Sequence, residues 1–299
     1  MGEGVFCYDL AIFNKSPAMR DHNFDLHCHS NISDGLLPPT EVVARAASQG
    51  VTVLALTDHD DVAGLEAARA AAVAHNLQLI NGVEISVTWG SHTLHIVGLR
   101  IDPLHPVLRA GLESIRHGRC ERAEKMAEQL GKAGIKDSLQ GAYQHAGNKN
   151  LIGRMHFARY LVAQGIVKDV RTVFKKYLVQ GKPGYVSHQW ATLGDAVGWI
   201  VASGGQAVLA HPGRYQMGSG KMHELLEEFK HLGGAGIEVV TGSHTPEQYP
   251  LFANLAQKFG LLSSRGSDFH APGEGYRDIG RLPALPEICT PIWHDWADC

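Results

Sequence analysis

The stretch NFDLHCHSNISDG, residues 23–35, decides how the rest of the chain is interpreted. It is typical of a short strand that carries His27 and His29 near its carboxyl end, followed by a turn that holds Asp34 and closes on a glycine. Alternate residues of a strand point to the same side, so the two imidazoles share a face while Cys28 points away. Two imidazoles and a nearby carboxylate predict the beginning of a metal site.

Strand-like and helical segments alternate after this stretch, which predicts βα units around a parallel sheet. Helical patterns cover residues 38–50, 63–76, 192–205, 221–236 and 247–260. Strand patterns cover residues 51–59, 77–87, 93–101, 206–212, 236–240 and 261–270. Residues 105–184 show long helical periodicity instead. The chain is therefore expected to form an α/β barrel of about seven strands with an inserted helical lobe.

Residues that can bind metals recur near the ends of these strands. In a parallel barrel the loops at the carboxyl ends of the strands meet on one face, and closure of the sheet places the last strand beside the first. A single histidine at a strand end is more often a structural residue, but one at nearly every strand end predicts a cluster. The residues are His27, His29, His59, Glu84, His95, His211, Asp268 and His270, with Asp34 on the first loop. Nitrogen and oxygen ligands without a thiolate suit Mn, Fe, Zn or Mg and can fill two or three sites.

Composition limits the other possibilities. The 299 residues, 44% hydrophobic and 19% charged with a net charge of −3, are typical of a globular protein that forms no stable nucleic-acid complex through bulk charge. No apolar run reaches the roughly 18 residues that a membrane span needs. Five cysteines without a CxxC pair favour a reducing compartment, so we expect a cytoplasmic protein. Residues 1–22 are expected to be a disordered or vector-derived leader.

The segments DLHCHSNISDG, LTDHD, GVEIS, LHIVG, LAHPG and GSDFH, in this order, resemble the motifs of the PHP (polymerase and histidinol phosphatase) family. The resemblance implies a distorted (β/α)7 barrel made of residues 23–104 and 185–299, with residues 105–184 as a helical lobe that caps the site. It also implies a centre of two or three divalent ions, manganese first. The positions that match the ligand pattern of the family are His27, His29, Asp34, His59, Glu84, His95, His211, Asp268 and His270.

Within the family, residues 152–190 together with LAHPGRY and GSDFHAPGE resemble the branch of nucleoside 3',5'-bisphosphate phosphatases, whose relatives also act as 5'-to-3' exoribonucleases on short RNA. The resemblance implies removal of the 3'-phosphate from pAp-like substrates to give a nucleoside 5'-monophosphate. The expected partner is thus a nucleotide or a short oligoribonucleotide, and the sequence does not identify a protein partner. Asp34, His59 and His211 are expected to act in catalysis. Arg154, His156 and Lys182 are expected to bind the substrate.

The implied reaction is metal-assisted hydrolysis without a covalent intermediate, and neither a GxSxG elbow nor a Walker pattern competes with it. Three alternatives stay open. A histidinol-phosphate phosphatase shares the cluster but gains nothing from a second phosphate. Metal-dependent amide or amine hydrolysis on a similar barrel releases ammonia instead of phosphate. A non-catalytic or proofreading PHP module of a polymerase complex is the third, although the complete ligand set argues against an inactive site.

Overall fold

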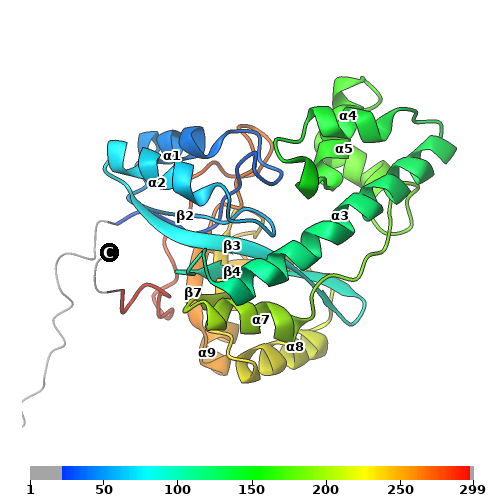
Figure 1. Ribbon diagram of the computed structural model, residues 1–299. Helices are drawn as coiled ribbons and strands as arrows, with labels where there is room; N and C mark the ends of the chain where they lie inside the picture. Colours follow the sequence, from blue (N-terminus) through cyan, green and yellow to red (C-terminus); the bar gives the residue numbers. More distant parts are fainter. Residues whose placement is uncertain (1–21, 297–299) are drawn as a thin grey trace, which may run out of the picture.

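A seven-stranded sheet, with its strands in the order β1 to β7, forms the centre of the computed structural model, which describes residues 22–296 (Figure 1). The strands are β1 (Phe24–Asp25), β2 (Val53–Leu56), β3 (Gln78–Trp89), β4 (His92–Leu99), β5 (Gln206–Leu209), β6 (Gly236–Thr241) and β7 (Leu262–Gly266). The Leu26 N–H donates to the Arg265 carbonyl at 3.0 Å, and Cys28 forms a parallel bridge with Phe269. The first strand therefore lies beside the last, and the predicted barrel is confirmed. The leader expected at residues 1–22 lies, apart from His22, outside the described residues.

Strand β4 runs antiparallel to both of its neighbours, whereas the other neighbouring strands pair in parallel. The expectation of a parallel sheet throughout is wrong at this strand, because the connection of Gly90 and Ser91 allows only a hairpin and no crossover. The reversal brings the first half of β4, with His95, to the rim where the parallel strands end. Glu84 was expected to end its strand, but β3 continues past it to Trp89.

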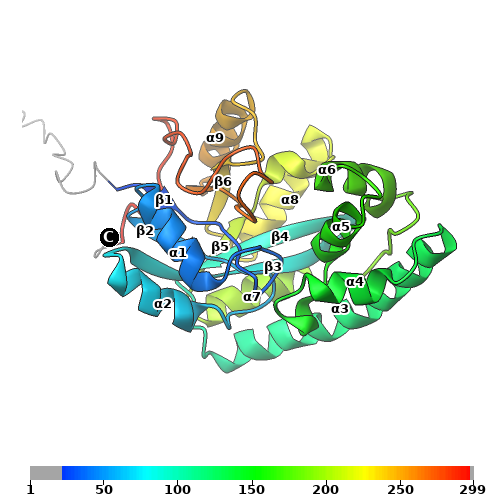
Figure 2. The same cartoon turned by 90° about the horizontal axis from the view of Figure 1, so that it is seen from above.

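Helices cover the barrel on two sides (Figures 1 and 2). Helices α1 (Pro39–Ser48) and α2 (Leu65–Ala74) lie together on one side, over an apolar layer that includes Val42 and Ala68. Helices α7 (Leu193–Ala202), α8 (Ser219–His231) and α9 (Gln248–Phe259) cover the other side with residues such as Ile200 and Phe229. Each helix presents its apolar positions to the sheet, as the sequence pattern predicts.

The segment between β4 and α7 forms the helical lobe, which lies beyond one end of the barrel (Figure 2). It contains α3 (Pro106–Lys132), α4 (Ser138–Gln144), η2 (Lys149–Leu151), α5 (Arg154–Ala163), α6 (Val170–Val173) and η3 (Phe174–Leu178). The lobe has an apolar cluster of its own, with Phe157 and Leu130 fully buried in it. Leu108 and Leu112 of α3 belong instead to the main core beside α7. Helix α3 thus joins two cores, and the lobe boundaries at residues 105 and 184 remain a prediction.

The described cysteines and helices bear on the expected compartment. Cys28, Cys120 and Cys289 are free thiols, while Cys7 and Cys299 lie outside the described residues. Within residues 22–296, none of the helices combines the length and the apolar character that crossing a membrane requires.

Candidate metal centre

All nine residues predicted to bind metal meet at one rim of the barrel. Their ligand atoms form four overlapping groups, and within each group the atoms lie within 4.8 Å of one another. The groups are His29, Asp34, His59 and His270; His27, Glu84 and His211; His27, His29 and Asp268; and His59, Glu84 and His95. Their role as ligands remains a prediction, but the structure brings together every residue that the prediction requires.

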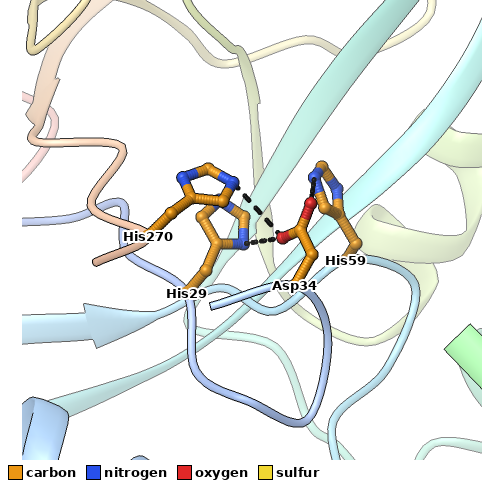
Figure 3. Close-up of side chains that lie close together, drawn as sticks. All are labelled: His29, Asp34, His59 and His270. Carbon is orange, nitrogen blue, oxygen red and sulfur yellow. Dashed lines mark ion pairs between the residues drawn. The ribbon is translucent and has the colours of Figure 1, made fainter. Parts of the chain in front are cut away.

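The group around Asp34 joins residues from the beginning and the end of the chain (Figure 3). Its Oδ1 atom lies 3.2 Å from Nε2 of His270 and 4.0 Å from Nδ1 of His29. Its Oδ2 atom lies 3.8 Å from Nε2 of His59. Three imidazoles thus surround one carboxylate, which is an arrangement suited to a cation bound between them.

The loop that carries Asp34 is fixed from below by Asp58. This buried side chain accepts hydrogen bonds from the Ser30 N–H at 2.8 Å and from the hydroxyls of Ser30 and Ser33, both at 2.6 Å. Gly35 closes the loop because a Cβ at this position would lie only 2.5 Å from the His29 carbonyl oxygen. The sequence therefore holds Asp34 on a turn with little freedom.

Glu84 lies at the centre of the cluster and is fully buried. Its carboxylate oxygens lie between 2.8 and 3.3 Å from ring nitrogens of His27, His29, His59, His95 and His211. Burial alone raises the pKa of Glu84, but the surrounding histidines outweigh it and hold the pKa well below its usual value. The group is therefore a carboxylate at neutral pH and can bridge two cations.

Several of these atoms have no hydrogen-bond partner although they are buried. They are Nδ1 of His29, His59 and His211, Oδ1 of Asp34 and Oε2 of Glu84. A buried polar atom without a partner costs about 1–3 kcal/mol, so five of them in one place need an explanation. Burial, with His270 in one case and Arg214 in the other, lowers the pKa of His29 and of His211 to about 3. Both rings are therefore neutral and offer a lone pair, and the residue set fits a divalent-metal centre.

A cavity of about 430 Å³ lies between this cluster and the lobe. The residues expected to act in catalysis, Asp34, His59 and His211, all line it. Arg154, expected to bind the substrate, lines it as well.

Two further predicted substrate-binding residues, His156 and Lys182, do not line the cavity among residues 22–296. His156 is fully buried, and its Nδ1 accepts the Gly153 N–H at 3.0 Å at the beginning of α5. Burial lowers the pKa of His156 to about 4, so the ring is neutral at pH 7, and its Nε2 atom has no hydrogen-bond partner. Lys182 is exposed on the loop after η3. Similarity of the surrounding sequence indicated both residues, but it does not show which way a side chain points.

Arg119 and Arg122 of α3 also line the cavity, and the sequence analysis missed them. Both guanidinium groups lie over the ring of Trp190, at 4.8 Å and 5.2 Å from its centroid. The Nε of Arg119 donates to Asp60 at 3.0 Å, whereas no carboxylate among the described residues pairs with Arg122. Two arginines three positions apart on a long helix share one face, and that spacing was the signal available in the sequence.

A family model and several curated proteins are similar to this chain over most of its length. The PHP domain family matches residues 25–242. A protein of Chromobacterium violaceum named 3',5'-nucleoside bisphosphate phosphatase is 57% identical over 273 residues, which is 91% of this chain and 96% of the relative. A 5'-3' exoribonuclease of Haemophilus influenzae is 43% identical over 270 residues, which is 90% of this chain and 97% of the relative.

Solved structures resemble the whole fold. One from Chromobacterium violaceum, described as an amidohydrolase with bound sulfate and no metal, has a TM-score of 0.89 at 56% identity and covers 91% of this chain and 95% of its own. Another from Bifidobacterium adolescentis, described as a metal-dependent phosphoesterase, has a TM-score of 0.76 at 27% identity and covers 90% of this chain and 92% of its own.

Proposed function

The chain belongs to the PHP domain family, and on this basis we propose that it removes the 3'-phosphate from nucleoside 3',5'-bisphosphates to give nucleoside 5'-monophosphates. The observation that carries the proposal is the pairing of two features across one cavity. The cluster of predicted metal ligands lines the barrel side of the cavity. Arg122 and Arg154, which have no acidic partner among the described residues, line the lobe side. A substrate with two phosphates needs both features.

On the barrel side, the nine clustered residues would hold two or three divalent ions, and manganese is the first to test because mixed imidazole and carboxylate ligation suits it. Ions bound there would activate water and neutralise the charge of the phosphate that is cleaved. Asp34, His59 and His211 reach the cavity from three different loops and would act at that phosphate. The guanidinium of Arg214 lies 2.8 Å from Asp268, is half exposed, and adds a positive charge at the same rim.

On the lobe side, Arg122 and Arg154 would bind the second phosphate. Burial, followed by repulsion from Arg154, lowers the pKa of Arg122 to about 9. Burial also lowers the pKa of Arg154, and neither arginine forms an ion pair with a carboxylate among the described residues. Buried cations without a counter-ion are costly, and a bound phosphate would supply one. Arg119 differs, because Asp60 already pairs with it.

An aromatic pair at the same end of the cavity would contact the nucleoside. The rings of His188 and Trp190 lie 4.3 Å apart at their centroids in an edge-to-face arrangement, and both line the cavity. Because Arg119 and Arg122 lie over the ring of Trp190, the orientation of that ring is held firmly.

Hydrolysis of short RNA from its 5' end is a related activity that we include in the proposal. A 5'-phosphorylated oligoribonucleotide presents the same terminal phosphate to Arg122 and Arg154, and a relative is named as a 5'-3' exoribonuclease. A cytoplasmic location also remains part of the proposal, supported by the three free thiols.

The test compares phosphate release from pAp, 3'-AMP, 5'-AMP and histidinol phosphate, and release of nucleoside 5'-monophosphate from a short 5'-phosphorylated RNA, with manganese supplied and then chelated. We expect kcat/KM for pAp to exceed that for 3'-AMP by about 10–100-fold, because a charged hydrogen-bonded contact is worth about 1.5–3 kcal/mol. Equal rates for these two substrates would overturn the assignment of the second phosphate. Ammonia release in a parallel assay with amide and amine substrates would favour the amidohydrolase alternative.

Two arginine variants test the lobe side of the cavity. Arg122→Met and Arg154→Met are expected to raise KM for pAp by about 10–100-fold while KM for 3'-AMP stays nearly constant, since each removes a charged contact to the second phosphate. Arg109→Met is the matched control, because Arg109 is an exposed residue of the same helix as Arg122 and does not line the cavity. Equal changes in KM for pAp and for 3'-AMP would contradict the assignment of Arg122 and Arg154 to the second phosphate.

A further inference from the structure

Glu238 of β6 is a buried carboxylate that is not one of the nine predicted ligands but contacts two of them. Its Oε1 atom lies 2.8 Å from Nδ1 of His27. Its Oε2 atom accepts the backbone N–H of His211 at 2.6 Å. One side chain thus connects the end of β1 with the end of β5, and each of its two oxygens has a different task.

The first task is to orient an imidazole. A histidine that donates its Nδ1 hydrogen to a carboxylate presents Nε2 as a lone pair, and the carboxylate fixes the plane of the ring. Nε2 of His27 lies 3.3 Å from Oε2 of Glu84 and 3.7 Å from Oδ1 of Asp268. Glu238 therefore turns the coordinating nitrogen of His27 towards the cluster.

The second task is to hold a strained backbone. His211 has φ of +27°, in a region that residues other than glycine rarely adopt. The hydrogen bond from its N–H to Glu238 fixes this conformation, in which Nε2 of His211 lies 2.9 Å from Oε1 of Glu84. Without that acceptor the backbone would relax and the ring of His211 would move away from Glu84.

Both tasks serve the same group of ligands. His27 and His211 are two of the three members of the group that Glu84 completes, whereas the group of His27, His29 and Asp268 contains only one residue that Glu238 contacts. No member of the group around Asp34 contacts Glu238, and among residues 22–296 no other carboxylate outside the nine forms a hydrogen bond with any of them. The metal sites at this rim are therefore unequally supported.

We propose that Glu238 is the positioning residue of one metal site, the one formed by His27, Glu84 and His211, and not of the site around Asp34. The proposal rests on the metal centre alone and is independent of which substrate the protein hydrolyses.

The test is Glu238→Gln, which keeps the shape of the side chain but leaves only one oxygen to accept. One of the two donors, the His27 ring or the His211 backbone, then loses its acceptor. Val239→Ala is the control, because Val239 is the next residue of β6 and packs in the main apolar core. Each protein is stripped with a chelator, refilled with manganese, freed of excess metal by gel filtration, and analysed for bound metal and by calorimetric titration. No substrate is used, so failure here and failure of the proposed function can be told apart.

We expect Glu238→Gln to weaken the binding of one manganese ion by about 10–100-fold, while the ion beside Asp34 binds as in the unaltered protein. Anomalous diffraction should show the loss beside His27 and His211 and full occupancy beside Asp34. Val239→Ala should lower the melting temperature of the metal-free protein and leave every metal affinity unchanged. Unchanged metal binding in Glu238→Gln, or an equal loss at all sites, would overturn the proposal. If Glu238→Gln does not fold, Glu238→Asp is measured with the same expectation, because the shorter side chain reaches neither donor well.

Discussion

The barrel rim and the helical lobe face each other across the cavity, but they are held in different ways. At the rim, functional side chains are fixed by buried carboxylates that accept two or more hydrogen bonds each, as Asp58 and Glu238 do. The first half of α3 packs in the main core, and ion pairs from α3 and α5 connect the lobe to loops of the barrel. Under the proposed function, the rim would hold the groups that act on the cleaved phosphate, and the lobe would hold those that bind the second phosphate.

Two charged contacts attach the lobe to different loops of the barrel. Arg119 pairs with Asp60 and also donates to the Ser86 hydroxyl at 3.0 Å. Arg159 pairs with Glu274 at 2.9 Å and donates to the Gly35 carbonyl at 3.2 Å. Polar attachments of this kind open at a lower cost than an apolar core, so the two regions should respond differently to single substitutions.

The largest expected effect concerns the rim. Glu84→Gln should lower kcat by about 10⁴-fold, equivalent to about 5 kcal/mol of transition-state stabilisation, because a neutral amide would hold divalent ions poorly and would not balance their charge. Steady-state phosphate release and bound-metal analysis measure it. Glu66→Gln, an exposed change on α2, should leave both unchanged. If the Glu84→Gln protein kept its activity and its full metal content, the rim would not hold the reacting groups as proposed.

The next effect concerns the attachment of the lobe. Asp60→Asn should cost about 3–5 kcal/mol, because it leaves the buried Arg119 charge without its partner. Asp278→Asn, which breaks a partly exposed pair with Arg45, should cost no more than about 1 kcal/mol. Urea unfolding gives the two free energies, and hydrogen exchange should show faster exchange in α3 to α5 for Asp60→Asn. If both variants unfold alike, the attachment of the lobe does not depend on this ion pair.

The smallest effect is a pH dependence within the lobe. The pKa of His156 is about 4 in the folded protein, below the usual value of about 6.5 for the unfolded chain. The unfolded state therefore binds a proton first, and stability falls as the pH decreases from 6.5 towards 4, by about 1 kcal/mol at pH 5.5 from this group. His156→Gln keeps an acceptor for the Gly153 N–H and should reduce this slope, whereas His75→Gln, at an exposed position, should not. Thermal unfolding at several pH values measures this dependence. Equal slopes of stability against pH in His156→Gln and the unaltered protein would contradict the role assigned to His156.

Sequence reasoning predicted the rim far better than the lobe, for a physical reason. The spacing of His27 and His29, and of Asp268 and His270, led to the correct rim, because both pairs follow neighbouring strands of the closed sheet. The strands are shorter than expected: β1 ends at Asp25 and β7 at Gly266, so both pairs lie beyond them, and Asp268 has φ of +53°. The antiparallel direction of β4 was not expected, because the pattern of residues in a strand is the same in both directions. The short connection between β3 and β4 was the only signal of it in the sequence.

In the lobe, short helices and loops set side-chain directions through tertiary packing, which no local pattern carries. Arg119 and Arg122 share one face of the long helix α3, but which face meets the cavity depends on how the helix packs, and both were missed. His156 and Lys182, which were expected to bind the substrate, do not line the cavity within residues 22–296, and their role stays a prediction. Glu238 was passed over as part of an ordinary strand, although an acidic residue within the apolar run GIEVV was a visible signal.

Helix α3 has one further consequence. Because α3 runs without a break from the main core to the core of the lobe, its length sets the distance between the cluster of histidines and carboxylates and Arg122. A change in its tilt would disturb the packing of Leu108 and Leu112 in the main core. Under the proposed function, this fixed distance would favour ligands whose two phosphates have a matching separation, and insertion or deletion of residues within α3 would change that preference.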